Sequence, residues 1–400
     1  MTPWLTVLGI GEDGLDPAGR AIVESAEFLV GGKRHLALAG AGPAERMTWQ
    51  RPLSRTLDAI LVRRPRPTVV LATGDPMWFG IGKSLARRVP AGEMRILPAV
   101  GAFSLAAARL AWPLESVATL SLHGRPLGLL ALHVAPGARL LALSHDGGTP
   151  ARVADWLTRR GYGTSRMKAL SHMGGPLETS AEGRADCWTA EVPDLNTLAI
   201  ECVAGDGAHI FSRAPGLPDE FFEHDGMLTK AHIRAVTLAL LAPTAGAHLW
   251  DVGAGSGAIG IEWIRAGGTA DAVEPLASRR AAMARNAEEL GAPGLEIRAG
   301  EAPAALEGLP APDAVFVGGG LSAGGVIEAA WEALRPGGRI VANAVTLEGG
   351  ARLARARSEL GGDLYRISVE TAAPVGGFNA FRPAMAVTQW AARKPWRAAS

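Results

Sequence analysis

The sequence predicts an α/β protein of two domains, and three observations lead to this conclusion. The chain has 400 residues, which is long for one domain and suits two of roughly 200 residues each. Short apolar runs repeatedly end in glycine or proline and continue as helical patterns, as in sheets built from alternating strands and helices. Periodicity stops between Gly205 and Gly226 and then restarts, so we place the domains at 1–207 and 208–400.

Composition argues against several functional classes. The formal net charge is +1, so no global field attracts nucleic acid or an anionic membrane surface. No apolar run approaches the roughly 18 residues of a membrane span, and the first residues do not read as a signal peptide. Cys187 and Cys202 lack metal-ligand spacing and cannot form a disulfide framework. We therefore expect a soluble, cytoplasmic protein with two core thiols and no metal site.

In the first half, most expected strands run directly into loops rich in glycine or proline. Asp16 is the expected N-cap of a helix that starts at Pro17. The loop 73–82, TGDPMWFGIG, is too constrained for an ordinary connector, because Gly74 permits close backbone approach and Asp75 places a carboxylate at a strand end. Strands are expected at 5–11, 28–30, 68–72, 94–97 and 140–143.

In the second half, residues 247–261, AHLWDVGAGSGAIGI, predict a strand, a tight loop and a helix. Gly253, Gly255 and Gly257 remove side chains that would keep a ligand off the backbone, and they permit positive φ. A nucleotide-like ligand can then lie near the helix N-terminus. The glycines alone do not choose this ligand, because Gly253, Gly255 and Ala258 also satisfy the dinucleotide fingerprint G-x-G-x-x-A.

Acidic residues follow two strands of this half. Asp251 ends the strand before the glycine loop. Glu274 ends the next strand-like run, at about the twenty-residue separation typical of a ribose-binding carboxylate. Two acids at neighbouring strand ends suit two ligand hydroxyls.

The remaining elements extend the alternating pattern. A helix is expected to begin at Met227, with Thr229 as its cap. Lys230, His232 and Arg234 on this helix could meet ligand carboxylates, or they are surface charges. Further helices are expected at 276–290 and 325–334, a strand at 339–344, and late strands at 365–370 and 384–390 separated by residues 374–383.

The second half resembles the class I S-adenosylmethionine-dependent methyltransferases. Asp251 with its glycine series resembles their motif I, and Glu274-Pro275 resembles their ribose-binding acid. Residues 300–302 fall where that family places an acid against adenine, and 313–320, DAVFVGGG, resemble its fourth strand. The resemblance implies a Rossmann-like, mostly parallel seven-stranded sheet. It also implies an S-adenosylmethionine site built from Asp251, Gly253, Gly255, Gly257, Glu274, Gly300, Glu301, Ala302 and Gly318.

The first half resembles the tetrapyrrole methylases, which bind S-adenosylmethionine in a different, class III fold. Its matching motifs are residues 9–14, 73–76, 98–103, 146–150 and 174–178. It departs from that family at Glu12-Asp13, where members usually have proline and glycine, and at Gly101-Ala102, where many have hydroxyl residues. The resemblance implies a second S-adenosylmethionine site at Gly11, Gly74, Asp75, Trp78, Gly101, Ala102 and His145.

The order of the two halves resembles the bifunctional corrin-ring methyltransferases of cobalamin (vitamin B12) biosynthesis. That resemblance implies methylation of carbons 5 and 15 of precorrin-6B and decarboxylation of the carbon-12 acetate, giving precorrin-8. Domain 1–207 would methylate carbon 5, and domain 208–400 would methylate carbon 15 and decarboxylate. Relatives of both halves commonly self-associate, so a homo-oligomer is expected. The candidates for binding the carboxylates of the tetrapyrrole are Lys230, His232, Arg234 and Arg382.

Three alternatives stay open at this level. The chain could methylate another tetrapyrrole without releasing carbon dioxide. It could be a fused oxidoreductase that binds NAD through Gly253 and Ala258. One half could instead be a scaffold or ligand sensor.

Overall fold

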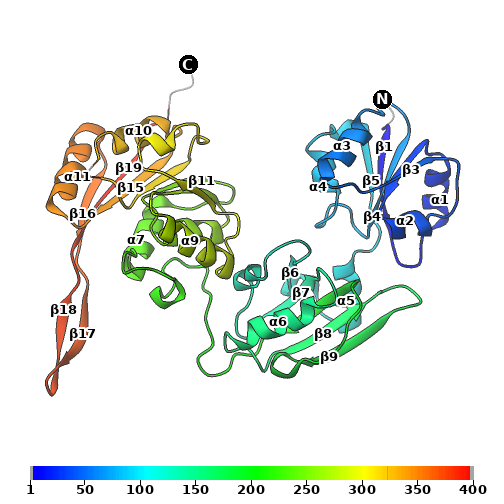
Figure 1. The fold of residues 1–400 in the computed structure, drawn as a ribbon, viewed down its shortest axis with the longest axis horizontal. Coiled ribbons are helices and arrows are strands. Elements are labelled where there is room, and N and C mark those ends of the chain that lie inside the picture. The colour runs from blue at the N-terminus through cyan, green and yellow to red at the C-terminus, as the bar shows by residue number, and fades with distance from the viewer. Residues whose placement is uncertain (1–2, 322, 397–400) are drawn as a thin grey trace. The chain divides into compact units, whose positions relative to one another are not determined.

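The computed structural model describes residues 3–321 and 323–396 and divides into two compact units (Figure 1). The first unit comprises Met1–Arg125 and Ala135–His209, and the second comprises Pro126–Val134 and Ile210–Ser400. The short segment Pro126–Val134 thus lies in the first half of the sequence but packs with the second unit. A Cβ placed on Gly128 would lie 1.4 Å from the carbonyl oxygen of Glu288, so only glycine fits this contact.

The first unit contains a five-stranded sheet in which all strands are parallel, in the order β3-β2-β4-β1-β5. Buried apolar side chains from its central strands, such as Val7, Val30 and Val70, form its core. The strands are β1 (Leu5–Ile10), β2 (Phe28–Gly31), β3 (Glu45–Thr48), β4 (Thr68–Thr73) and β5 (Met94–Leu97), with helices α1 (Pro17–Glu24), α2 (Lys33–Leu38), α3 (Leu53–Leu61) and α4 (Gly82–Ala86).

A second, mixed sheet completes the first unit, in the order β6-β7-β10-β8-β9. Only β6 and β7 pair in parallel, and the other neighbours are antiparallel. Its strands are β6 (Ala118–Ser121), β7 (Arg139–Leu143), β8 (Arg166–Ser171), β9 (Thr179–Arg184) and β10 (Asn196–Glu201), with helices α5 (Ala102–Leu110) and α6 (Thr149–Thr158).

The second unit is built on a seven-stranded sheet in the order β13-β12-β11-β14-β15-β19-β16. Only β19 runs opposite to the other six strands, so the predicted mostly parallel α/β sheet is confirmed. The strands are β11 (His248–Val252), β12 (Thr269–Glu274), β13 (Glu296–Ala299), β14 (Ala314–Val317), β15 (Arg339–Ala344), β16 (Asp363–Ile367) and β19 (Val387–Arg393). The helices are α7 (Ala231–Leu241), α8 (Ala258–Arg265), α9 (Ala277–Glu289), α10 (Val326–Ala333) and α11 (Leu347–Leu360).

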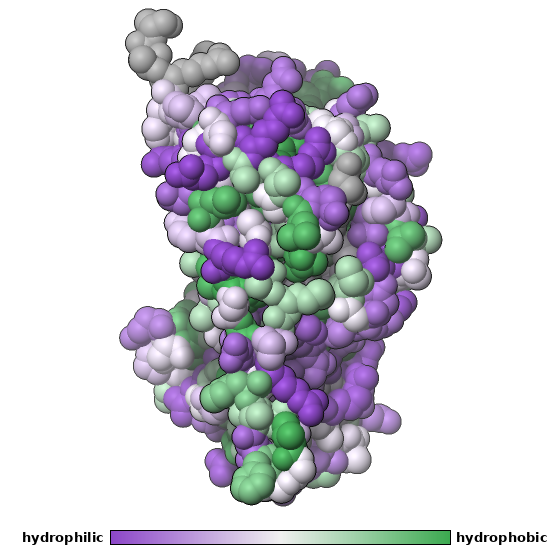
Figure 2. Space-filling model, turned by 90° about the vertical axis from the view of Figure 1, so that its left-hand side faces the viewer, coloured by the Kyte–Doolittle hydropathy of each residue, from purple (hydrophilic) through white to green (hydrophobic). Residues whose placement is uncertain are grey.

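A hairpin stands where the sequence predicted only a connection between the last strands. Strands β17 (Glu370–Val375) and β18 (Phe378–Pro383) pair with each other and project from the sheet of their unit (Figure 1). Both strands of a two-stranded ribbon are edges, so prolines are tolerated there. The side chains of Phe378 and Phe381 are 83% and 70% exposed. Figure 2, which views the molecule from the hairpin side, shows hydrophobic residues interspersed among polar ones.

Several local predictions can be compared with the structure. The Asp16 cap is confirmed, since its side chain accepts a hydrogen bond from the Gly19 N–H. The Thr229 cap is wrong, because Lys230 occupies the N-cap of α7 and the side chain of Asp219 accepts the hydrogen bond from Ala231 N. Cys202 is a buried thiol as expected, but Cys187 is exposed, which corrects the expectation of two core thiols.

Candidate active sites

The first unit holds a large pocket, with a volume of about 1890 Å³, lined by loops at the carboxyl ends of its strands. Apolar and aromatic side chains form much of its wall, with polar groups at several strand ends, as ligand pockets require. The pocket brings together all seven residues that the sequence placed in this site: Gly11, Gly74, Asp75, Trp78, Gly101, Ala102 and His145.

The loop after β4 is packed backbone to backbone against the loop before α5. Gly74 has φ +56°, and a Cβ on it would lie 2.8 Å from Gly101 Cα. The Ala99 N–H donates to the Gly74 carbonyl oxygen at 3.1 Å. Asp75 fixes the next turn by accepting from the Met77 N–H at 2.8 Å. The sequence therefore needs glycine at position 74 for both conformation and space.

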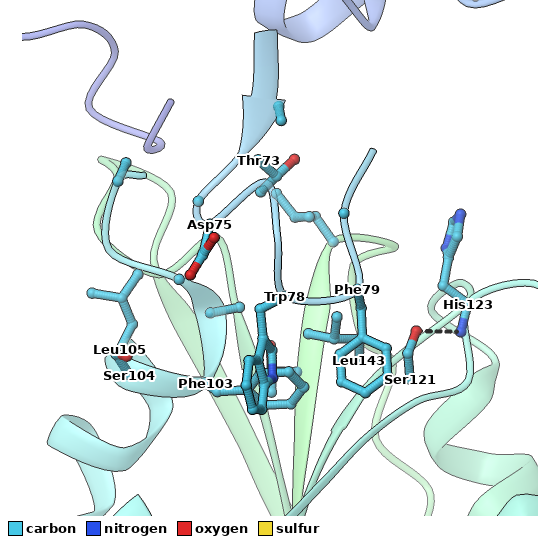
Figure 3. A pocket seen from close by; sticks show the side chains of 18 of the residues that line it. Thr73, Asp75, Trp78, Phe79, Phe103, Ser104, Leu105, Ser121, His123 and Leu143 are labelled. Atoms are coloured by element: carbon cyan, nitrogen blue, oxygen red, sulfur yellow. Dashed lines mark hydrogen bonds between the residues drawn. The ribbon is translucent and has the colours of Figure 1, made fainter. Parts of the chain in front are cut away.

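An aromatic cluster extends this loop into the pocket. Figure 3 shows Asp75 above the rings of Trp78, Phe79 and Phe103. The Phe79 ring lies 6.1 Å from that of Trp78 and 5.9 Å from that of Phe103, in edge-to-face contacts. Trp78 remains 55% exposed. These rings offer an apolar surface to a flat ligand. The sequence analysis named Trp78 and did not name Phe79 or Phe103, although all three lie in the motifs it singled out.

The second candidate site is the loop between β11 and α8. Gly253, Gly255 and Gly257 have φ values of +68°, +57° and +79°, as the motif predicted. A Cβ on Gly253 would lie 2.6 Å from both the nitrogen and the Cα of Gly319, which follows β14. A Cβ on Gly257 would lie 2.4 Å from Met283 Cγ. Two strand-end loops thus meet through bare backbone, which leaves peptide groups at the sheet edge.

The two predicted acids are buried beside this loop. Glu274 accepts hydrogen bonds from the N–H groups of Gly255, at 2.9 Å, and Leu276, at 3.1 Å. Asp251 Oδ2 accepts from the Gly260 N–H at 2.8 Å, while its Oδ1 has no partner among the described residues. Burial raises the pKa of Asp251 from 3.8 to about 7, and the nearby charge of Glu274 adds to this rise. A buried acceptor without a partner fits a ligand hydroxyl.

This raised pKa predicts how stability depends on pH without ligand. Because the folded pKa lies above the unfolded one, the stability contributed by the bound proton is complete below pH 3.8 and is lost as pH rises through about 7. Asp251→Asn should remove most of this loss. Urea unfolding at pH 5 and pH 8, with hydrogen exchange used to assign the transition of the second unit, measures it. An unchanged pH dependence in the variant would contradict the assignment.

The other predicted cofactor residues of this half follow adjacent strands. Gly300, Glu301 and Ala302 come directly after β13, and Gly318 comes directly after β14. The Glu301 side chain is exposed. A Cβ on Gly318 would lie 2.6 Å from the Phe316 ring, so a side chain at this position would displace that ring. Because β13, β12, β11 and β14 are consecutive in the sheet, their loops share one edge.

The surroundings of Arg234 argue against the prediction that this residue contacts the substrate. Its side chain is fully buried. Its Nε donates to Glu262 Oε1 at 2.9 Å, and its Nη1 donates to Asp219 Oδ1 at 2.7 Å. The carbonyl oxygens of Leu217 and Thr229 accept further hydrogen bonds from the guanidinium. The residue therefore ties α7 to α8 and to the segment before α7, and its burial keeps it from the surface.

Replacing Arg234 should severely destabilise the second unit. Arg234→Met leaves the carboxylate of Glu262, which is 3% exposed, without its charge partner. Loss of one member of a buried pair costs about 3–5 kcal/mol. Arg285→Met, which breaks an exposed pair with Glu223, is the control and should change little. Denaturant midpoints of both variants measure the difference, and equal effects would contradict this role.

The remaining substrate candidates lie on the surface. Lys230 is an exposed residue whose Nζ lies 3.6 Å from Asp219 Oδ2. His232 is exposed on α7, and Arg382 is exposed on β18, where its Nη2 donates to the Pro374 carbonyl oxygen. Their role in substrate binding stays a prediction. Within residues 3–321 and 323–396 no cluster of metal-ligating side chains occurs, and no helix is long and apolar enough to cross a membrane.

Comparison with known proteins gives both units a family. Residues 6–186 match the tetrapyrrole (corrin/porphyrin) methylases, and residues 220–394 match the precorrin methyltransferase domain. A precorrin-6Y C(5,15)-methyltransferase [decarboxylating] from Sinorhizobium sp is 49% identical over 398 residues, which cover 98% of this chain and 96% of that relative. The chain belongs to the precorrin-6Y C(5,15)-methyltransferase (decarboxylating) family. This confirms the predicted family, fold class and activity as a methyltransferase of cobalamin biosynthesis, with S-adenosylmethionine as methyl donor.

Two further relatives are shorter than this chain. A cobalt-precorrin-7 C(5)-methyltransferase from Salmonella typhimurium is 34% identical, covering 41% of this chain and 82% of that relative. A probable cobalt-precorrin-6B C(15)-methyltransferase (decarboxylating) from Pyrobaculum calidifontis is 40% identical, covering 37% of this chain and 80% of that relative. Each of these names describes methylation at a single ring carbon.

Proposed function

We propose that the two units carry separate methyl-donor sites and perform separate methylations of one tetrapyrrole. The first would methylate carbon 5 in the pocket beside Gly74. The second would methylate carbon 15 beside the Gly253 loop and decarboxylate the carbon-12 acetate, which leaves a methyl group on carbon 12 and releases carbon dioxide. The observation that carries this proposal is the presence of two glycine-lined strand-end sites in unrelated sheets of one chain.

The donor supplies an electrophilic methyl group on a sulfonium. The chain's residues would orient it, because enamine-like carbons of a reduced tetrapyrrole are already nucleophilic and need mainly alignment, worth several kcal/mol. In the second unit, Glu274 and the partnerless oxygen of Asp251 would accept from ribose hydroxyls. In the first, Trp78 and Phe79 would cover a flat face of substrate or donor.

The sheet order supports methyl transfer over the NAD alternative. Dinucleotide-binding sheets of the 3-2-1-4-5-6 type are parallel, whereas here antiparallel β19 is inserted between β15 and β16.

We further propose that carbon 15 is methylated first. The C(15) relative is named for a cobalt-precorrin-6B substrate, and the C(5) relative for cobalt-precorrin-7.

We also propose self-association, which the exposed Phe378 and Phe381 support. A cytoplasmic location is proposed because the two free cysteines suit a reducing compartment.

Incubation of the purified chain with precorrin-6B and methyl-labelled S-adenosylmethionine tests this function. We expect a product that is two methyl groups heavier and one carbon dioxide lighter by mass spectrometry. A product with two added methyl groups but no loss of carbon dioxide would indicate a different tetrapyrrole chemistry and contradict the proposal.

A further inference from the structure

A histidine and a carboxylate from distant parts of the chain meet in the first unit's pocket. Glu12 follows β1 and His172 follows β8, and both line the pocket. Glu12 Oε2 lies 3.0 Å from His172 Nδ1. Glu12 and Asp13 stand where the tetrapyrrole methylases usually carry proline and glycine.

The carboxylate is held from its other side by Arg34. The second oxygen of Glu12 forms an ion pair with Arg34 Nη1. Arg34 Nη2 donates to His35 Nε2 at 3.0 Å, so this nitrogen is an acceptor and His35 is neutral in this arrangement. Burial, followed by the charge of Arg34, lowers the pKa of His35 to about 4. The Nε2 atom of His35 is thus already engaged, by Arg34 and by Thr73 Oγ1 at 2.9 Å.

His172 is fixed in a conformation that few residues adopt. Its φ is +49°, in the left-handed region, and such strain persists only where the surroundings impose it, often at functional sites. Its N–H donates to the Leu195 carbonyl oxygen. A Cβ on Gly175 would lie 2.7 Å from Glu12 Cβ, so the loop after β8 lies directly against Glu12.

A second ion pair anchors the same loop. Glu178 accepts from the Gly174 N–H at 2.7 Å and from two nitrogens of Arg109 at 2.6 and 2.9 Å. The Arg109 side chain lowers the pKa of Glu178 to about 2, with help from the Gly174 N–H. The charged groups around His172 are thus Glu12, Arg34 and the Arg109–Glu178 pair. The Nε2 atom of His172 has no hydrogen-bond partner among the described residues, and His172 lines the pocket.

We propose that His172 accepts the proton that the ring carbon releases during methylation in the first unit, with Glu12 and Arg34 as positioning residues. This inference rests on the proposed carbon-5 methylation. An electron pair of the ring forms the new carbon–methyl bond, and the methyl–sulfur bond breaks with its pair returning to sulfur. The carbon–hydrogen bond then breaks, its pair returns to the ring, and the proton moves to His172 Nε2 and on to water.

Histidine suits this step because its ordinary titration lies closest to neutral pH. A carboxylate on Nδ1 fixes the tautomer that leaves Nε2 free to accept, and stabilises the imidazolium that forms. The contact matches this role, since Glu12 engages Nδ1 and no described residue engages Nε2.

Steady-state carbon-5 methylation by the full chain tests the inference, with the product followed by mass. His172→Asn should lower kcat for this step by roughly 100-fold or more. It should leave the KM for S-adenosylmethionine and the carbon-15 reaction of the same molecule unchanged. The acid limb of the kcat–pH profile should disappear in His172→Asn. Glu12→Gln should lower kcat without changing the KM for S-adenosylmethionine, because it removes the charge that stabilises the imidazolium.

Asp13→Asn is the matched control, since Asp13 is an exposed acid beside Glu12 without a contact to His172. The Asp13→Asn variant should retain normal rates and pH dependence.

A normal carbon-5 rate in His172→Asn, or an acid limb that survives in this variant, would overturn the inference while leaving the proposed function intact. Failure of the unmodified chain to methylate carbon 5 would contradict the proposed function and this inference with it. If His172→Asn does not fold, an unchanged kcat in Glu12→Gln overturns the inference.

Discussion

Gly253→Ala should abolish carbon-15 methylation and carbon dioxide release while leaving donor binding to the first unit intact. The added Cβ would lie 2.6 Å from backbone atoms of Gly319, and the residue must keep φ +68°. The two strand-end loops must therefore separate. Displacing reacting groups by about 1 Å can cost roughly 100-fold in rate, and we expect at least that loss.

Gly246→Ala is the matched control for this variant. Gly246 lies in the same unit with φ +78°, but a Cβ there meets nothing within 4 Å. The Gly246→Ala variant has an alanine at positive φ but no steric overlap, so its reaction rates should stay near normal. Product masses and released carbon dioxide measure both variants. Normal decarboxylation by a folded Gly253→Ala protein would show that the Gly253 loop is not the second donor site.

Gly74→Ala should stop carbon-5 methylation and cause an intermediate to accumulate. A Cβ on Gly74 would lie 2.8 Å from Gly101 Cα at φ +56°, so it pushes apart the loops that carry Asp75 and Ala102. Because we place the carbon-15 reaction first, the product should be one methyl group heavier and one carbon dioxide lighter than the substrate. Mass spectrometry of a single incubation distinguishes this species from the doubly methylated product.

The control for Gly74→Ala is Gly137→Ala in the same unit. Gly137 has φ +75° and open space around its Cα, so strain is matched and steric overlap is absent. It should yield the doubly methylated product at a normal rate. Accumulation of the same intermediate by both variants would mean that backbone strain in the first unit, not the contact with Gly101, impairs the reaction.

The glycine loop of the second unit could be predicted from sequence because its determinants are local. The strand, the positive-φ glycines and Asp251 lie within one short stretch, and Glu274 follows at the next strand end. The five expected strands of the first half are also confirmed, each within one residue of its predicted ends. These strands are short apolar runs with glycine or proline near their ends, which is the pattern that sequence reasoning detects best.

Other features depend on contacts between distant residues. Strand β9 is a largely exposed run, TSAEGR, with no apolar alternation, so only its pairing with β8 makes it a strand. Arg234 looked like a surface charge or ligand contact until Glu262 and Asp219 were placed around it. The Glu12–His172 pair spans 160 positions. The sequence marked Glu12 as a departure from the family pattern, but only the fold supplies its partner.

The central claim is that one chain holds two methyl-donor sites in two different folds. Isothermal titration of the full chain with S-adenosylhomocysteine, the product left after methyl transfer, tests it most directly. The account predicts two equivalents bound per chain, and one equivalent each for Gly74→Ala and Gly253→Ala. A single equivalent bound by the unmodified chain, lost completely in one of the two variants and retained in the other, would contradict it.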